Sequence, residues 1–304
     1  MKGLDLSKKY YEEYGRKMIA ETVPEISHRI AVGLAGDGSQ CFGFDDEISR
    51  DHDFAPGFCM WLTDDDYQKY GTALQEAYHR LPDDYMGILR RASDASGRLG
   101  VSRISDFYSE FTGCTQGPVT NGEWLMCPET SLAACTNGEI FYDPVGRFSE
   151  IRSRILEFYP EDVLRKKIAA RAAVMAQSGQ YNLPRCLQRS DKVAATLAAG
   201  RFTEATLSMV HLLNRRYMPF YKWSFRSACS LEKLSQVPEL LCELHHSMKT
   251  ETVEQICALV AEELCHQEFS TFRGTFLQDH LSDIMSAIKD PEIAALPPMA
   301  DFNF

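Results

Sequence analysis

The feature of this sequence that most limits its fold is a change of pattern near residue 148. Before that point, short apolar stretches alternate with glycines and other turn residues, as they do in α/β regions. After it, apolar residues recur at helical spacing through long stretches such as 162–177 and 252–269. We therefore predict an α+β protein with two domains. Residues 1–147 form a mixed β-sheet with flanking helices, and residues 148–304 form an all-α helical bundle.

The charged residues divide at about the same place. The chain has a formal net charge of -11; residues 1–150 hold 14 Lys+Arg and 25 Asp+Glu, and residues 151–304 hold 18 of each. A protein with this acidic excess is a poor candidate for binding duplex nucleic acid, because that affinity comes mainly from neutralising phosphates. A small substrate, or a cation that bridges to one, is the better expectation.

Cysteine usage and hydropathy indicate the compartment. The ten cysteines form no CxxC pair, and a chain of this length does not need disulfides to fold, so we expect reduced thiols. No stretch has about 18 uninterrupted apolar residues, and charges are scattered through the N-terminal segment, unlike in a signal peptide. We therefore expect a cytoplasmic protein with no membrane span. The oligomeric state stays open.

The first domain has a clear order of expected elements. Leu6, Tyr10, Tyr14 and Met18 recur every four residues and predict a helix that ends at Val23-Pro24. Pro56-Gly57 interrupts the second expected strand, which suits a strand at the sheet edge or a bulge. The remaining elements of this domain are expected strands at 28–36, 51–62, 99–104 and 138–144, with a second helix at 64–81.

An acidic, glycine-containing stretch follows the first expected strand. Glycine lets the backbone approach a ligand closely, so Gly38 and the hydroxyl of Ser39 are suited to hold phosphate oxygens. Successive strand side chains point to opposite faces, so Asp51 and Asp53 would share one face about 6.5 to 7 Å apart at Cα. Two carboxylates facing the same space repel each other unless a cation joins them. Mg²⁺ is the expected cation, because it prefers oxygen ligands and takes few of them from the protein.

These residues resemble the signature of a known superfamily. A Gly-Ser pair at 38–39, followed by Ser-Arg-Asp-His-Asp at 49–53, resembles the pattern of the nucleotidyltransferase superfamily that includes the kanamycin and lincosamide nucleotidyltransferases. The stretch 38–54 resembles more closely an uncharacterised bacterial family of unknown-function domains within that superfamily. Three further stretches share this likeness, at 138–148, 179–194 and 215–223. The resemblance implies that the predicted sheet is nucleotidyltransferase-like.

The resemblance also implies an activity. It implies Mg²⁺-dependent transfer of a nucleoside monophosphate from an NTP such as ATP to a hydroxyl of a small molecule or a protein side chain, with pyrophosphate leaving. Gly38 and Ser39 would hold the β- and γ-phosphates, and Asp51 and Asp53 would be the catalytic metal ligands.

Active members of the superfamily usually have a third carboxylate on a later strand, where it binds a second metal or accepts a proton. Here the expected strand is followed by Asp106, which is our candidate, with Glu110 and Glu139 as weaker ones. If no acid reaches the metals, the alternative is a catalytically inactive binding or regulatory protein with the same fold.

The helical half would supply cations that bind the triphosphate and side chains that line the binding site of the acceptor. Lys222 is the candidate for contacting the triphosphate, and Tyr221, Tyr181 and Asn182 are candidates for binding the acceptor or base. An equally good interpretation makes the 215–223 segment a helix end with core aromatics and the 177–185 segment an ordinary loop.

Two other groups also have two interpretations. The acids at 45–47 either meet a cationic acceptor or form a solvated turn, and the turn is favoured. A zinc site is the less favoured interpretation of five residues on two expected helices, which more often serve in packing: Cys242, His245, His246, Cys265 and His266.

Overall fold

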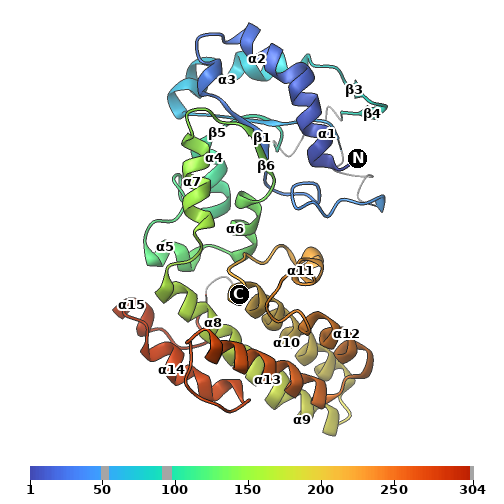
Figure 1. Ribbon diagram of the computed structural model, residues 1–304, viewed down its shortest axis with the longest axis vertical. Coiled ribbons are helices and arrows are strands. Elements are labelled where there is room, and N and C mark those ends of the chain that lie inside the picture. Colours follow the sequence, from blue (N-terminus) through green and yellow to red (C-terminus); the bar gives the residue numbers. More distant parts are fainter. Residues whose placement is uncertain (49–54, 91–97, 302–304) are drawn as a thin grey trace. The chain divides into compact units, whose positions relative to one another are not determined.

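A computed structural model describes residues 1–48, 55–90 and 98–301 (Figure 1). It is an α+β structure, mostly helical with a small mixed sheet. The chain divides into two compact units, one made of Met1–Val119 with Ser131–Glu157 and the other of Thr120–Thr130 with Phe158–Phe304. The sequence-predicted boundary at residue 148 falls in the first turn of α7 (Arg147–Leu156), a helix of the first unit.

The first unit is built on a four-stranded sheet with the order β5-β2-β1-β6. Strand β1 pairs antiparallel with both neighbours, so that Val32 lies opposite Met60 and Leu34 lies opposite Glu139. Strands β2 and β5 are parallel, which requires a crossover, and α3 (Asp64–His79) provides it. The strands are β1 (Ala31–Leu34), β2 (Cys59–Leu62), β5 (Gly100–Arg103) and β6 (Glu139–Tyr142), and β3 (Asp84–Tyr85) and β4 (Ile88–Leu89) form a separate hairpin.

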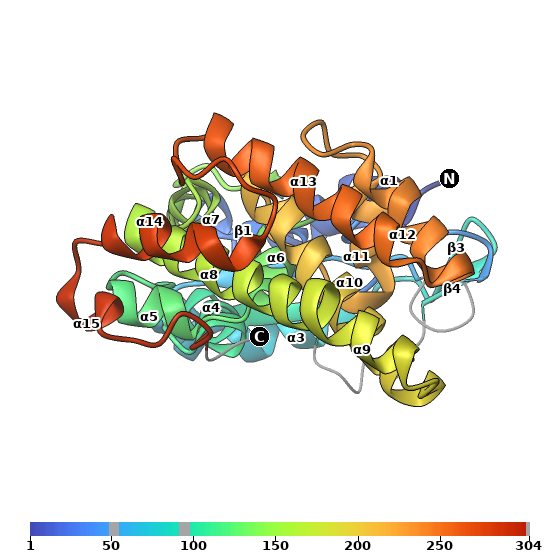
Figure 2. The ribbon, with the colours of Figure 1, turned by 90° about the horizontal axis from the view of Figure 1, so that it is seen from below.

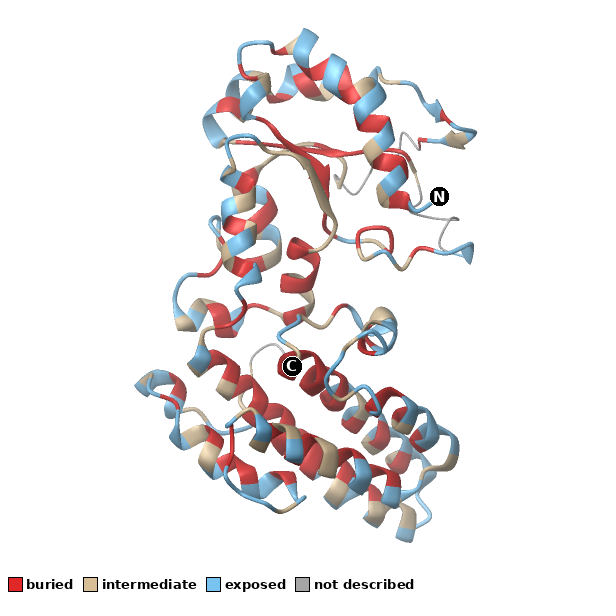
Figure 3. Ribbon diagram, in the orientation of Figure 1, coloured by how far each residue is buried: buried red, intermediate tan, exposed pale blue. Residues whose placement is uncertain are grey.

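Helices cover both faces of this sheet. Met60 belongs to an aromatic-rich core with the opening helix and α3, which contribute Tyr10 and Tyr78 respectively. Trp61, the next residue of β2, faces the other way and stacks on Phe148 of α7 with the ring centroids 4.0 Å apart. Phe107 of α4 (Ile104–Thr112) meets the same tryptophan edge-on. Figure 3 shows the buried strands between these helical layers.

The opening helix is confirmed, and one expectation about the second strand is wrong. The helix runs through α1 (Gly3–Tyr10), a π-helical turn (Tyr11–Gly15) and α2 (Arg16–Thr22). Strand β2 is not at the sheet edge, because it pairs with β1 on one side and β5 on the other. Pro56-Gly57 precedes the strand and lies outside the ladder, so the missing N–H of proline costs no hydrogen bond there.

The second unit is helical, as predicted. Helix α8 (Glu161–Met175) continues through η4 (Ala176–Asn182) into α9 (Leu183–Gln188), and α8 lies beside α10 (Lys192–Leu213) in both Figure 1 and Figure 2. The other helices are α5 (Asn121–Met126), α11 (Tyr221–Ala228), α12 (Val237–Ser247), α13 (Thr250–His266), η5 (Leu277–His280), α14 (Leu281–Ser286) and α15 (Pro291–Ala294), while α6 (Glu129–Thr136) has residues in both units.

The described residues contain no helix long and apolar enough to cross a membrane. All ten cysteines are free thiols, as expected; the buried ones are Cys41, Cys59, Cys127, Cys135 and Cys257.

Buried His211 on α10 makes the stability of the protein dependent on pH. Its Nδ1 lies 2.7 Å from the carbonyl of Leu207, which can only accept, so Nδ1–H donates there and Nε2 accepts from the Ser227 hydroxyl at 2.9 Å. Burial lowers the pKa of this imidazole, so it stays neutral in the folded protein.

We expect this stability to be present at pH 7.5 and to fall as the pH drops below about 6.5, because the unfolded chain then binds a proton that the native imidazole rejects. The loss is at most about 1.4 kcal/mol per pH unit and stops below the native pKa. Urea unfolding at pH 7.5 and 5.5 measures it. The difference should shrink in His211→Gln and persist in His246→Gln, an exposed residue of α12. Equal pH dependence of the two variants would contradict the assignment.

Candidate functional site

The loop that follows β1 is built around two glycines. Gly36 and Gly38 have φ angles of +111° and +113°. Residues other than glycine rarely adopt this backbone conformation. At Gly38 a Cβ would lie 2.4 Å from Nη1 of Arg98. The sequence Gly-Asp-Gly-Ser therefore permits a tight turn that no other residue type at 36 and 38 would form without strain.

Side chains from the segments before β5 and β6 hold this loop. The Asn137 amide accepts from Gly36 N–H at 2.9 Å and donates to the Gly36 carbonyl at 2.8 Å. Arg98 Nη1 donates to the carbonyl of Asp37 at 2.9 Å. The loop is thus fixed before any ligand arrives, which is the arrangement that phosphate-binding loops use.

Replacing Gly38 with alanine tests how much this turn matters. Gly43 offers a matched control, because it also has a positive φ (+70°) but a Cβ there would meet nothing within 4 Å. We expect Gly38→Ala to lose about 1–3 kcal/mol of unfolding free energy through strain and displacement of Arg98, and Gly43→Ala to lose about 1 kcal/mol. Chemical denaturation of both variants measures this. A smaller loss for Gly38→Ala than for Gly43→Ala would mean that the loop can accommodate a Cβ at Gly38 without strain.

The far end of the loop corrects the interpretation of its acids. Asp45 is 5% exposed, accepts from Gly3 N–H at 3.0 Å and lies 3.5 Å from Nζ of Lys2. It anchors the loop to the start of α1 and is not part of a solvated turn. Asp46 is exposed and accepts from Ile48 N–H at 3.1 Å, the local backbone bond expected of a turn residue.

The predicted metal ligands Asp51 and Asp53, with Ser49, lie outside the described residues. The described residues before 49 and after 54 do show at which end of the sheet this segment begins and ends. Because β1 and β2 are antiparallel, the loop after Leu34 and the segment before Cys59 are at the same end of the sheet. Ser39, 9% exposed, belongs to that end, since it follows Leu34 by five residues.

The structure does not bring Asp106 to the Gly-Ser loop. Strand β5 is parallel to β2, so its last residue is at the opposite end of the sheet. Asp106 follows in the first turn of α4, where its side chain is 59% exposed and pairs with Arg103 at 3.2 Å. Glu110 lies further along the same helix.

Glu139 lies at the end of the sheet that carries the loop. It opens β6, directly opposite Leu34, the last residue of β1. Its carboxylate accepts a hydrogen bond from Lys8 of α1 and raises the pKa of that ammonium. Sequence reasoning ranked Glu139 below Asp106 because it could not foresee that β6 pairs with β1.

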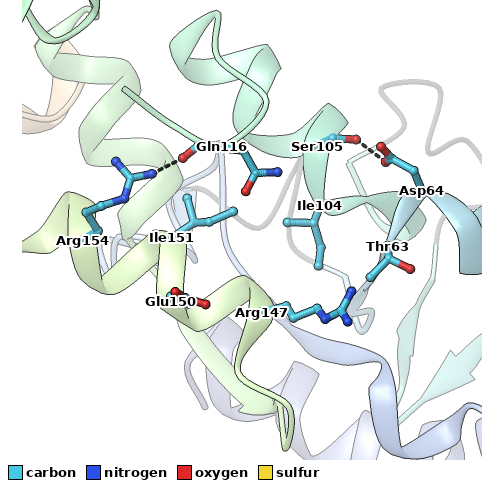
Figure 4. A pocket seen from close by; sticks show the side chains of 9 residues that line it. All are labelled: Thr63, Asp64, Ile104, Ser105, Gln116, Arg147, Glu150, Ile151 and Arg154. Carbon is cyan, nitrogen blue, oxygen red and sulfur yellow. Dashed lines mark hydrogen bonds between the residues drawn. The ribbon is translucent and has the colours of Figure 1, made fainter. Parts of the chain in front are cut away.

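A cavity of about 440 Å³ lies at the opposite end of the sheet from the loop. Figure 4 shows the Arg147 guanidinium directed toward Thr63, which follows β2, and the Ser105 hydroxyl donating to Asp64. The other residues that line the cavity are Ile104, Gln116, Glu150, Ile151 and Arg154. This cavity is separate from the predicted site, and no motif in the sequence indicated it.

The residues predicted in the helical half do not come together. Gly179, two residues before Tyr181, packs against Phe202 in the middle of α10. Lys222 and Tyr221 lie on α11, which contacts His211 near the end of α10. Nine residues of α10 separate His211 from Phe202, a helix rise of about 13–14 Å. Tyr221 is 74% exposed, Asn182 is exposed, and Lys222 lies over the ring of Trp223.

Sequence reasoning missed a buried charge cluster in the helical unit. Arg171 of α8 is 1% exposed; its Nη2 lies 3.4 Å from Oε2 of Glu129, and its Nε donates to Ser208 Oγ at 2.8 Å. Ser208 in turn donates to Glu129 at 2.7 Å. Burial lowers the pKa of Arg171. Burial and the charge of Arg171 lower the pKa of neighbouring Lys167 to about 7, against the opposing effect of the Glu129 carboxylate, and Lys167 Nζ also lies 3.3 Å from Asp301. The sequence carried no signal for this cluster, because α8 is buried by the elements packed around it and not by a pattern of its own.

The metal predictions find no support among residues 1–48, 55–90 and 98–301. No group of three or more His, Cys, Asp and Glu side chains there could hold a metal ion. The candidate zinc residues do not form such a group, and Cys242 is exposed.

Comparison with known proteins gives a match over part of the chain. No curated protein matches this chain, and no solved structure does. The match covers about one third of the chain and contains Glu129, Lys167, Arg171 and Ser208. Residues 124–224 match a family described as a domain of unknown function (DUF4037).

Proposed function

We propose that this protein is a Mg²⁺-dependent nucleotidyltransferase. It transfers a nucleoside monophosphate from an NTP such as ATP to a hydroxyl of a small molecule or a protein side chain. The observation that carries this proposal is the loop of Gly36, Gly38 and Ser39, held by Asn137 and Arg98 at the end of β1. Its glycines let a ligand approach the backbone closely, and Arg98 places a cation beside it.

Chain connectivity supports a place for Asp51 and Asp53 near this loop. The described chain resumes at Ala55, three residues before Phe58, whose carbonyl already accepts from Gly100 N–H at the start of the sheet. Asp53 precedes Ala55 by two residues, a span of at most about 7 Å. The proposal assigns both carboxylates to Mg²⁺, with water and phosphate oxygens as the remaining ligands. When bound, Mg²⁺ neutralises charge on the triphosphate and its leaving pyrophosphate.

The other residues of this end have simpler roles in the proposal. Backbone N–H groups of the loop and the Ser39 hydroxyl hold the β- and γ-phosphates, and Arg98 adds positive charge. Glu139 takes the position of the third carboxylate and accepts the proton of the attacking hydroxyl. Lys8 donates to the Glu139 carboxylate at 2.5 Å and so holds it at this end of the sheet.

The alternative is a catalytically inactive binding or regulatory protein. The ion pair between Glu139 and Lys8 favours it, because a carboxylate committed to a structural pair does no chemistry. In that case NTP and Mg²⁺ would raise the melting temperature without any release of pyrophosphate. A screen of labelled NTPs against candidate acceptors, with pyrophosphate release as the signal, tests the proposal and separates the two functions.

A matched pair of substitutions identifies the third carboxylate. We expect Glu139→Gln to lower kcat by about 100-fold or more, the usual contribution of a general base, with a small change in KM for NTP. Asp106→Asn should change kcat by less than about threefold, because that carboxylate is at the other end of the sheet and well exposed. Steady-state pyrophosphate release measures both. The reverse order of effects would return the role to Asp106.

A further inference from the structure

Three buried cations in the helical unit are not explained by the proposed nucleotide site. Lys166, Lys167 and Arg171 all project from α8, and their exposed fractions are 0%, 0% and 1%. Burying a charge costs several kcal/mol unless a partner compensates it, and apolar residues of the same size would usually be as stable. A cluster of this kind is therefore a candidate for binding an anion.

In this structure a segment of the same chain fills the place of that anion. Lys167 Nζ lies 3.3 Å from the carboxylate of Asp301, and Arg171 pairs with the other oxygen of that carboxylate. Lys166 Nζ donates to the carbonyls of Pro298, at 2.9 Å, and Ala300. The Asp301 side chain is 0% exposed, so it is fully inserted between the cations.

The part of the chain between α15 and Asp301 has few apolar anchors among its described residues, 295–301. These residues form no helix or strand. Pro297 and Pro298 are exposed, and Met299 is 46% exposed. Segments with little buried apolar surface open locally at a small cost in free energy. Within the described residues, the polar contacts of Asp301 and Lys166 help to hold this segment against α8.

A further hydrogen-bond donor, the Tyr159 hydroxyl, lies near the cations. The Tyr159 hydroxyl is buried and has no hydrogen-bond partner among the described residues, although buried hydroxyls normally have one. Its ring lies 5.1 Å from Lys167 Nζ. Burial, and then the Glu129 carboxylate, raise the pKa of Tyr159 well above its usual value, so the group remains a hydrogen-bond donor.

We propose that Lys167, Arg171 and Tyr159 form a binding site for a phosphate group, and that Asp301 occupies this site until such a ligand displaces it. Arg171 Nη1, which now pairs with Asp301, donates to a phosphate oxygen in this site, while Nε and Nη2 stay with Ser208 and Glu129. A phosphate dianion carries twice the charge of the aspartate that it replaces. It also has a spare oxygen for the tyrosine hydroxyl. This site does not depend on the proposed nucleotidyl transfer.

Titration calorimetry on the full chain tests the exchange, with inorganic phosphate and AMP as probes at constant ionic strength. Asp301→Asn removes the competing charge, and we expect it to bind one of these probes about tenfold tighter than the unsubstituted protein, because the competent state is no longer blocked. Asp279→Asn, at an exposed position of η5, is the control and should bind like the unsubstituted chain. Adding Tyr159→Phe to Asp301→Asn should weaken binding. Equal affinity of all variants, or no binding to Asp301→Asn, would overturn the proposal.

The choice of probe separates two sources of the phosphate group. Tighter binding of inorganic phosphate would assign the site to the free ion, and tighter binding of AMP would assign it to a phosphate ester. Should Asp301→Asn fail to fold, hydrogen exchange of the unsubstituted protein gives an independent answer. Phosphate should speed exchange of the amides of Met299, Ala300 and Asp301 relative to an equal ionic strength of chloride. Unchanged exchange at saturating phosphate would contradict the displacement.

Discussion

Replacing Asp51 and Asp53 together with asparagine is expected to abolish pyrophosphate release while leaving the fold intact. The two substitutions keep side-chain volume and remove the negative charge that holds Mg²⁺. The metal supplies several kcal/mol of transition-state stabilisation in such reactions, so kcat should fall by about 1,000-fold or more. The unfolding free energy should stay equal or rise, because two neighbouring carboxylates no longer repel each other.

The control for this experiment is an exposed acid pair elsewhere in the first unit. Asp64 and Asp65 open α3, and asparagine at both positions keeps the shape of that turn. This variant should retain the rate of the unsubstituted protein within about threefold. The melting temperature of the Asp51/Asp53 variant should also no longer respond to ATP with Mg²⁺ over ATP with EDTA. A full metal-dependent shift in that variant would remove the basis of the proposed function.

Replacing Arg171 with methionine is expected to give the largest loss of stability in the helical unit. The substitution leaves the carboxylates of Glu129 and Asp301 buried opposite Lys167, with the Ser208 hydroxyl short of a donor. Removing one partner of a buried ion pair costs roughly 3–5 kcal/mol. Urea denaturation at pH 7 measures the change.

Arg201 of α10 is the matched control. It pairs with Glu204 at 3.2 Å, but the two side chains are 47% and 53% exposed. Arg201→Met should cost less than about 1 kcal/mol, because exposed ion pairs contribute little. The double variant Arg171→Met with Glu129→Gln should recover part of the loss, since one of the uncompensated charges is gone. Similar losses for Arg171→Met and Arg201→Met would show that the buried cluster does not stabilise the unit.

Much of the fold follows from local pattern. The opening helix, the strand before Gly36 and the long helices of the second unit each appear where the apolar spacing predicts them, because one face of each is buried. Which strands pair with each other in the sheet was not predictable in the same way. The position of β2 inside the sheet depends on pairing with β1 and β5, which are distant in sequence, so Pro56 gave the wrong indication of an edge.

The site is predictable to a smaller extent, for the same physical reason. The glycines at 36 and 38 could be identified because their conformation is a local property, and both have the positive φ that a tight loop needs. The clamp from Asn137 and the position of Glu139 depend on β6 meeting β1, about 100 residues along the chain. No local pattern encodes that contact.

The buried cations show a different limit. In the sequence, Lys166, Lys167 and Arg171 look like the solvated face of an amphipathic helix. In the structure α8 is buried on nearly all sides instead. The carboxylate that compensates the buried cations belongs to Asp301, more than 100 residues further along the chain.

The most direct test of the proposed function is a crystal structure of the protein soaked with a non-hydrolysable ATP analogue and Mg²⁺. The proposal predicts that the triphosphate lies within hydrogen-bond distance of the Ser39 hydroxyl and that carboxylate oxygens of Asp51 and Asp53 coordinate the metal. A nucleotide bound elsewhere, or those two aspartates turned away from a triphosphate at the loop, would contradict it.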